Sequence, residues 1–453
     1  MTDLTKTLNV SLFIFVLIID TNLLRTTSAK KPAVDAAHSI TSLPAPCVRG
    51  TFKSSRDTIP PGWTGPVFQL SQSFPDSLPS PEPLPWKTID FKTDPLAYAL
   101  ALRDYVFQGN VDPANPNAPW IIQNNTVRKW YHAPWMDAGA NGREFIHGLT
   151  RELTSVPGQL AKNPPQNKPV QNWAVGFYNA PGGFILGQVW CEPTNPSLTA
   201  IKFPEGTVSA KLLFTTAPIS QVPFLAGSVQ WQANINQSAS SPRTPQTVRL
   251  LQIDLAVRDS RNTDTGWVFG TLIYNPANGS SNRWENMQPV GLMWGDDPGV
   301  TPTVGTIKQS WLNPATATLM QHYGWAERLN GPVDNPLSSC LSCHATAGWP
   351  VAPLTPPSGS TDTQRLKWFK NVPAGQAFQA GQASQDYSLQ LTFGIRQFKA
   401  ANPGGGGVHA VVGLTSAVGP QRVVNRAGES EAQYRKDVLR ELAKRKRKAQ
   451  YQQ

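Results

Sequence analysis

The most regular pattern of the chain lies in Arg249-Leu-Leu-Gln-Ile-Asp-Leu-Ala-Val-Arg258. Every second side chain is apolar, and these are Leu251, Ile253, Leu255 and Val257. The positions between them include Gln252, Asp254 and Arg258. Because side chains alternate across an extended chain, this pattern predicts a β-strand with one face in the core.

Similar strand-like segments surround this stretch, at 173–178, 183–190, 207–214, 228–235 and 266–274. Turn sequences separate them, such as Pro181-Gly182-Gly183, Asn278-Gly279 and Asp297-Pro298-Gly299. The 42 Pro and 35 Gly also favour many loops over long helices. Short alternating strands with hairpin-type turns predict a mainly β fold with irregular loops and a few short helices. We expect an antiparallel sheet or a partial barrel.

The remaining elements are predicted from caps and periodicity. Asp94 as N-cap and Pro95 at the first helical position begin a helix that ends near Phe107. A short helix is plausible at 365–370, and alternating apolar residues predict a last strand at 386–398. Residues 433–450 are rich in helix formers and predict a charged surface helix or a frayed end.

The chain divides into five segments by composition. Residues 1–29 have an apolar run after Lys6 and end in Thr27-Ser28-Ala29, which is typical of a secretory signal peptide. Residues 30–90 form a Pro-rich extended arm, 91–335 the mainly β body, and 336–400 the segment that contains the motif described next and the closing strand. A Gly-rich and basic tail occupies 401–453. We therefore expect an exported, periplasmic protein.

Residues 340–344 read Cys340-Leu-Ser-Cys343-His344, the C-x-x-C-H arrangement that takes haem covalently. Two thiols at this spacing each add to one vinyl group of the porphyrin, and the adjacent imidazole binds the iron. This predicts one covalent haem c per chain, with Cys340, Cys343 and His344 binding the cofactor and His344 as the metal ligand. A zinc half-site or a thioredoxin-like redox pair are the alternatives, and zinc would want a second ligand pair.

The other two cysteines, Cys47 and Cys191, would share the oxidising compartment implied by export, and the sequence leaves open whether they pair. The net charge of +11 is concentrated near the C-terminus, so no nucleic-acid partner is expected. The basic tail could dock a redox partner or an anionic surface, or it could be an ordinary solvated charge run.

The sequence does not decide which residue, if any, would bind the iron on the side opposite His344. No Met occurs after Met320, so the ligand of small helical cytochromes c, a Met downstream of the motif, is excluded. The remaining candidates for a sixth ligand are Met287, Met293, Met320, His132, His147, His322 and His409. A dense stretch at 120–160 contains His132, Arg143, Glu144 and His147, and it predicts either a site wall or buried ion pairs.

The motif makes the chain resemble c-type cytochromes. A looser likeness links it to the β-sheet cytochromes of the cytochrome c′-beta type and to relatives that oxidise hydroxylamine, which carry the motif after the strands. Phe203-Pro-Glu-Gly-Thr-Val-Ser-Ala-Lys211-Leu and Gly266-Trp-Val-Phe269 look like strand motifs of that group. The resemblance implies a pentacoordinate haem over a small distal pocket, with a cross-linking lysine that Lys211 matches only loosely. By alternation Lys211 leaves the apolar strand face, which favours an ordinary solvent-facing lysine.

These observations predict a monohaem c-type cytochrome that binds haem and transfers electrons with an unidentified redox partner. The main alternative is a haem enzyme or gas-binding protein with an open distal site, acting on a small nitrogen or oxygen species. A binding protein with a structural haem is a third interpretation.

Overall fold

The strand predicted at 249–258 lies inside the longest strand of the main sheet, β5 (Thr244–Arg258). It pairs with β3 (Val208–Thr215) on one side and β6 (Trp267–Tyr274) on the other, and its first residues pair with β4 (Gln230–Ile235). This computed structural model describes residue 52 and residues 60–136, 143–161, 166–237, 241–357, 359–403 and 431–450. These residues belong to one compact unit, Ala37–Gln453.

The main sheet has eight strands in the order β1-β2-β3-β5-β6-β7-β8, and β4 pairs with the first part of β5 on the edge opposite β3. Every pair of neighbouring strands is antiparallel, as predicted. The other bounds are β1 (Thr150–Arg151), β2 (Asn172–Tyr178), β7 (Met287–Met293) and β8 (Ser310–Leu312). A small second sheet joins β9 (Gly348–Trp349) to β10 (Ala383–Ser384). The fold is therefore mainly β, as the sequence indicated.

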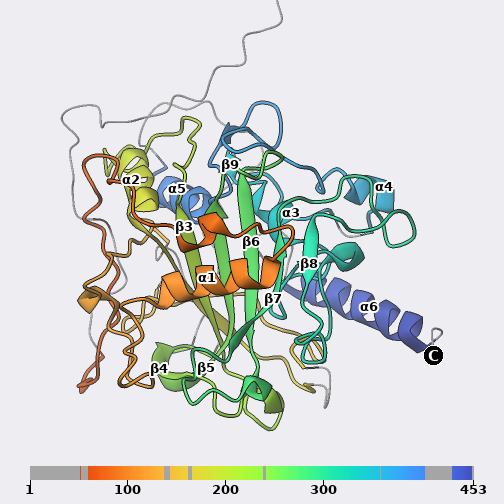
Figure 1. Ribbon diagram of the computed structural model, residues 1–453, viewed down its shortest axis with the longest axis horizontal. Coiled ribbons are helices and arrows are strands. Elements are labelled where there is room, and N and C mark those ends of the chain that lie inside the picture. The colour runs from red at the N-terminus through yellow and green to blue at the C-terminus, as the bar shows by residue number, and fades with distance from the viewer. Residues whose placement is uncertain are drawn as a thin grey trace, which may run out of the picture. The chain divides into compact units, whose positions relative to one another are not determined.

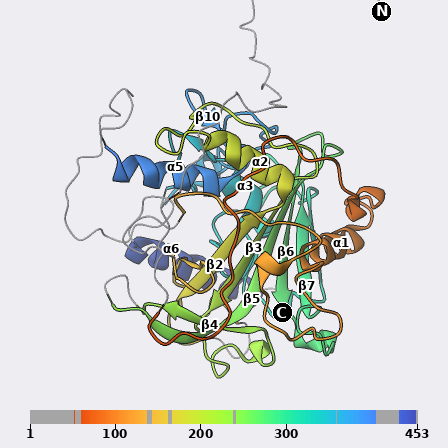
Figure 2. The same cartoon turned by 90° about the vertical axis from the view of Figure 1, so that its left-hand side faces the viewer.

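The apolar face of the sheet packs against α1 (Pro95–Phe107), which crosses the strands in Figure 1 and lies to one side of them in Figure 2. Asp94 caps this helix by accepting a hydrogen bond from the Ala97 amide at 3.2 Å, as predicted. Ile253 and Leu255 of β5 are buried here with Leu102 of α1. This face forms the larger hydrophobic core of the chain.

The opposite face of the sheet is also covered. The helices over it are α2 (Ala180–Val189), α3 (Cys340–His344) and α5 (Leu389–Ala401), which lie together near one end of the strands in Figure 2. Trp267 and Phe269 of β6 pack there in one cluster with Leu341 and Leu391. Polar strand residues on this face, such as Asp254, therefore point into the protein interior and not into bulk water.

Two predicted strands are helices. Residues 183–190 belong to α2, where the Asn179 side chain accepts from the Gly182 amide and Pro181 lies in the first turn. A Cβ atom on Gly183 would come within 2.6 Å of the Tyr131 ring, and one on Gly187 within 2.7 Å of Phe74. The glycines, one turn apart, let the helix approach these aromatic rings, so they are packing positions and not turn residues.

The predicted last strand at 386–398 is α5. Its N-cap is Ser388, whose hydroxyl accepts from the Leu391 amide at 3.2 Å. The helix buries the alternating residues Leu389, Leu391 and Phe393, and it also buries Thr392 and Gly394. Because the helix is buried on most sides, its sequence does not show a clear helical stripe, and short alternation misleads.

The remaining helices are short or peripheral. The helix predicted at 365–370 lies earlier in the chain, as α4 (Asp362–Arg365). It begins there because Thr361 is its N-cap. The basic tail forms α6 (Glu431–Gln450), as predicted, and its Val438 and Leu442 pack on Val156. The described residues also include the short 3-10 helices η2 (Pro85–Thr88), η3 (Ile122–Asn124), η4 (Pro223–Leu225), η5 (Pro276–Asn278) and η6 (Trp325–Glu327).

The Pro-rich arm is described from residue 60 onward, where Phe68, Leu70 and Trp86 are buried in the larger core. The predicted signal segment 1–29, Cys47 and His409 lie outside the described residues. Among the helices in the described part of the chain, none combines the length and the apolar character that a membrane crossing needs.

Candidate functional site

The pentapeptide 340–344 forms the single helical turn α3. Ser339 and Ser342 form a reciprocal cap at its N-terminus. Ser339 accepts from the Ser342 amide at 2.9 Å, and the Ser342 hydroxyl accepts from the Ser339 amide at 2.8 Å. Ser339 also donates to the buried Asp296 carboxylate at 2.5 Å. Since residues three apart lie on one face of a helix, this turn directs both thiols to the same side.

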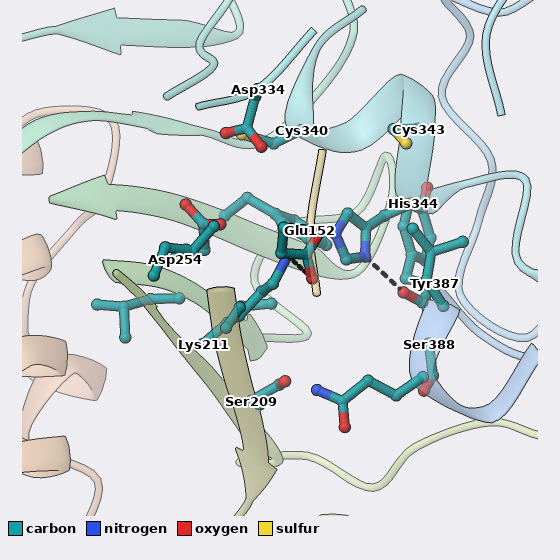
Figure 3. A pocket seen from close by; sticks show the side chains of 18 of the residues that line it. Glu152, Ser209, Lys211, Asp254, Asp334, Cys340, Cys343, His344, Tyr387 and Ser388 are labelled. Carbon is teal, nitrogen blue, oxygen red and sulfur yellow. Dashed lines mark hydrogen bonds and ion pairs between the residues drawn. The ribbon is translucent and has the colours of Figure 1, made fainter. Parts of the chain in front are cut away.

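The turn forms one wall of a large cavity. Cys340, Cys343 and His344 all line it, and the opposite wall is the inner face of β2, β3, β5 and β6 (Figure 3). The cavity holds about 1570 Å³ of space not filled by atoms, its open mouth included, and water molecules could centre themselves in about 160 Å³ of it. Its lining is mainly apolar, with Leu213 and Phe269 from the strands and Phe393 from α5.

His344 is held in one orientation. Its Nδ1 donates a hydrogen bond to the Tyr387 carbonyl oxygen at 2.9 Å, and Figure 3 shows the ring reaching into the cavity. Its ring packs against Phe269 with the centroids 5.0 Å apart. Because a carbonyl oxygen can only accept, Nδ1 carries the proton, and Nε2 is the nitrogen with a lone pair for a metal.

The corner that presents the Tyr387 carbonyl is strained. Asp386 and Tyr387 have φ values of 44° and 66°, which L side chains rarely adopt. The Asp386 carboxylate holds the corner by accepting from the Phe203 amide at 2.6 Å, the Gly375 amide at 2.9 Å and the Trp267 indole at 3.0 Å. These contacts stabilise an unfavourable backbone that aims one carbonyl at the histidine.

Four ionisable side chains from separate segments meet in the cavity. The Lys211 ammonium lies 3.2 Å from the Glu152 carboxylate, and Lys211 is directly opposite Asp254 in the pairing of β3 with β5. The Gln252 amide nitrogen donates both to Asp254 at 2.7 Å and to Asp334 at 2.8 Å. Figure 3 shows Asp334 beside Cys340. Three carboxyl groups thus share one lysine.

Burial dominates the proton affinities in this cluster. Burial, then the neighbouring Asp334 carboxylate, raise the pKa of Asp254 to about 7, although Lys211 acts in the opposite direction. Burial likewise raises the pKa of Asp334. Burial, followed by the charges of Asp334 and Asp254, raises the pKa of the Cys340 thiol well above its usual range. At neutral pH Cys340 is therefore a neutral thiol, and the aspartate pair gains or loses a shared proton near neutrality.

The structure separates the candidates for a sixth iron ligand. Met287, Met293 and Met320 are buried in the hydrophobic clusters, and His147 and His322 also lie outside the cavity lining. Burial lowers the pKa of His322 to about 4, with Arg445 acting in the same direction. Of the candidates that are described, His132 lines the cavity. Met136, which was not among the ligand candidates predicted from the sequence, lines it as well.

The dense stretch at 120–160 is divided between the site and the core. His132, Met136 and Glu152 line the cavity. Glu144 instead organises a loop by accepting from the Ile146 amide at 2.8 Å, and hydrogen bonds from His147 and this amide lower its pKa against the effect of burial. His147 stacks on Trp231 at 4.3 Å. Both interpretations of this stretch therefore hold, for different residues.

Lys211 is not the solvent-facing lysine that alternation favoured. It does leave the apolar strand face, but the second face of the sheet is covered, so the side chain lines the cavity and is 22% exposed. Asp254 was missed as a site residue for the same reason, whereas Asp334 lies in a turn, outside any strand pattern. A mid-strand aspartate reads as a solvent-facing position until something is known to cover that face.

The residues that line this cavity fit a c-type haem. Two thiols lie on one side of a helical turn, an oriented imidazole follows them, and an apolar hollow faces all three. In the described part of the chain, no cluster of three or more His, Cys, Asp or Glu side chains is arranged to hold a bare metal ion. Neither Cys340 nor Cys343 is in a disulfide bond, whereas Cys191 is.

Comparison with protein-family models, with curated proteins and with solved structures finds no match to this chain.

Proposed function

We propose that the chain is a single-haem c-type cytochrome that transfers one electron to or from a partner protein. One observation carries this proposal: Cys340, Cys343 and His344 line the same large cavity, with His344 oriented through the Tyr387 carbonyl. A covalent haem in this cavity would supply a one-electron iron couple.

Each residue has a defined part in this proposal. The two thiols would hold the macrocycle at its edge, and His344 Nε2 would bind the iron. The hydrogen bond from Nδ1 to the Tyr387 carbonyl keeps the ring from rotating and makes Nε2 more basic. Apolar walls such as Phe269 and Phe393 keep water from the reacting centre. The disulfide at Cys191 is the kind of bond that an oxidising, extracytoplasmic compartment permits.

The full-length chain should be expressed in a bacterial host that carries the c-type maturation machinery, purified, and tested for covalent haem. We expect one haem per chain, which stays with the polypeptide in denaturant and has the pyridine haemochrome spectrum of two thioether bonds. Cys340→Ser and Cys343→Ser should each lose one thioether, and His344→Ala should lose the proximal ligand. Cys191→Ser breaks a disulfide bond outside the cavity and should keep both thioethers.

A wild-type chain that folds without covalent haem would overturn the proposal. C340S and C343S variants that both keep two thioether bonds would show that the motif is not the attachment site.

A second candidate function is a haem enzyme or gas-binding protein acting on a small nitrogen or oxygen species. It is favoured by the ionisable groups that line the cavity, namely His132, Glu152, Lys211, Asp254 and Asp334, because proton donors and acceptors are what such reactions need. The antiparallel sheet with the motif after its strands also supports a likeness to the cytochrome c′-beta type. This support concerns architecture, which many unrelated functions share.

Optical spectra of the haem-loaded protein with carbon monoxide and nitric oxide separate the two functions. A low-spin iron that binds neither gas supports the electron carrier. A high-spin iron that binds both supports the open-site enzyme.

A further inference from the structure

The aspartate pair Asp254–Asp334 is the feature of the cavity that haem attachment leaves unexplained. Asp254 comes from the middle of β5 and Asp334 from a turn six residues before Cys340. The chain joins them through one side chain, since both hydrogens of the Gln252 amide are used, one for each carboxylate. The Gln252 amide oxygen accepts from the Val333 amide at 3.2 Å, which fixes its orientation.

The pair is built to hold one proton. Two carboxylates bridged by one amide repel each other when both are ionised, and burial adds to that cost. The ammonium group of Lys211, which faces the pair, also forms an ion pair with the Glu152 carboxylate at 3.2 Å. Three carboxyl groups beside one ammonium group would give a net charge of −2, and one retained proton reduces it to −1.

The pair is coupled in space to the attachment point of the macrocycle. The Thr271 hydroxyl donates to the Asp254 carboxylate at 3.1 Å and lies 3.8 Å from the Cys340 sulfur. Asp334 lies beside the same cysteine in Figure 3. One side chain therefore separates the carboxylates from the atom that would carry the haem. A change of charge on a haem attached at that sulfur would be only weakly screened by the protein around the pair.

We propose that Asp254 and Asp334 together are the proton-exchange site of the haem, which takes up a proton when the iron is reduced and releases it when the iron is oxidised. The inference rests on the proposed function. The electron comes from the one-electron redox partner and the proton from solvent through the open cavity mouth. With haem bound, reduction would add one electron to the iron and one proton to the pair, which would go from two ionised carboxylates to one shared proton. The charge of the cavity is unchanged.

The charged and titratable groups that face the pair come from every element packed against it. Lys211 faces it from β3, Glu152 from the segment after β1, and Cys340 from α3, while β6 contributes the neutral Thr271. Cys340 would be an uncharged thioether once haem is attached, and the Lys211–Glu152 pair is already formed. The raised pKa of Asp254, about 7, places the exchange near neutral pH.

The test is the midpoint potential of the haem-loaded, full-length protein, measured by spectroelectrochemistry from pH 5 to pH 9. We expect the potential to fall as the pH rises through neutrality, because the aspartate pair holds its proton more tightly when the iron is reduced. Asp334→Asn and Asp254→Asn should each remove most of this pH dependence. Both variants keep the size of the side chain and an acceptor for Gln252, and either one alone decides the question if the other fails to bind haem.

Glu152→Gln is the matched control, because it makes the same change in the same cavity. It should keep the pH dependence and shift it to lower pH, since Lys211 is then available to stabilise the ionised aspartates. If both Asp→Asn variants keep the wild-type dependence, the inference is wrong and another group, such as a haem propionate or Asp296, exchanges the proton. A wild-type potential that does not change with pH would also overturn it.

Failure of the proposed function looks different, because a chain without covalent haem has no potential to measure.

Discussion

At the scale of single residues, the same side-chain chemistry has opposite consequences in different places. Asp259 accepts from Arg261 and from Tyr98, and these bonds lower its pKa to about 2 against the effect of burial. Asp296 has a single side-chain donor, Ser339, and burial raises its pKa to about 7. Asp296 lies directly behind the first turn of α3, so its protonation bears on the helix that carries the haem motif.

These two carboxyls contribute in opposite directions to the pH dependence of stability. The folded-state pKa of Asp296 lies above the ordinary value of 3.8, so the folded state binds its proton more tightly than the unfolded state. This stabilisation is complete below pH 3.8 and is lost as the pH rises towards 7. Replacing Asp296 by Asn, which stays neutral, should therefore become less destabilising, or more stabilising, between pH 5 and pH 8, by a few kcal/mol at most.

Urea unfolding of the wild type and the variant at both pH values measures this change. Asp259→Asn is the control, because that carboxyl is ionised throughout this range and the cost of its replacement should not depend on pH. A constant difference between D296N and the wild type would contradict the assignment.

At the scale of elements, α6 shows that a run of charges is not always a solvated tail. Its Val438 and Leu442 are buried against Val156, and Arg445 donates to the backbone carbonyls of Gly324 at 3.0 Å and Pro336 at 3.3 Å. Pro336 lies four residues before Cys340. The helix therefore docks beside the segment that leads into α3. The apolar positions that direct this docking are few, which is why the charge run dominates the sequence pattern.

Two leucines in this helix provide a matched test. Leu442 is 7% exposed and Leu439 is 45% exposed. Leu442→Asp would place a charge in the contact with Val156 and should lower the free energy of unfolding by about 2 kcal/mol. It should also expose α6 to limited proteolysis. Leu439→Asp should leave both properties close to wild type, and equal sensitivity of the two variants would contradict the docking.

At the scale of the whole molecule, the sheet separates two hydrophobic regions with different roles. The face towards α1 has a closely packed core of aliphatic and aromatic residues. The other face leaves about 1570 Å³ unfilled, mouth included, between the strands and the helices α3 and α5. Apolar walls without a partner stabilise a fold less than packed ones, so the second face should depend on what fills it.

A variant in which Cys340 and Cys343 are both replaced by Ala tests this division. Without covalent haem, we expect far-ultraviolet circular dichroism to keep the β signature, because the core on the α1 face is independent of the cavity. The thermal midpoint should fall clearly below that of the haem-loaded wild type, since a bound ligand stabilises the state that binds it. Complete loss of the β signature would instead show that the haem is needed for the whole fold.

The sequence alone predicted what depends on local chemistry. Alternation identified β2 to β6, the Asp94 cap identified α1 to the residue, and the spacing of Cys340, Cys343 and His344 singled out three residues that line one cavity. It failed at α2 and α5, where helices are buried on several sides and their composition resembles that of strands. In both cases the N-cap residues, Asn179 and Ser388, were the overlooked indication.

Only the tertiary structure decided which residues belong to the site. Lys211, Glu152, Asp254 and Asp334 come from four segments, and the covered second face of the sheet brings them together behind Cys340. The carbonyl that orients His344 comes from Tyr387, 43 residues later in the chain. A sequence pattern reports which side of a strand is polar, but whether that side meets water or a cavity depends on what packs over it.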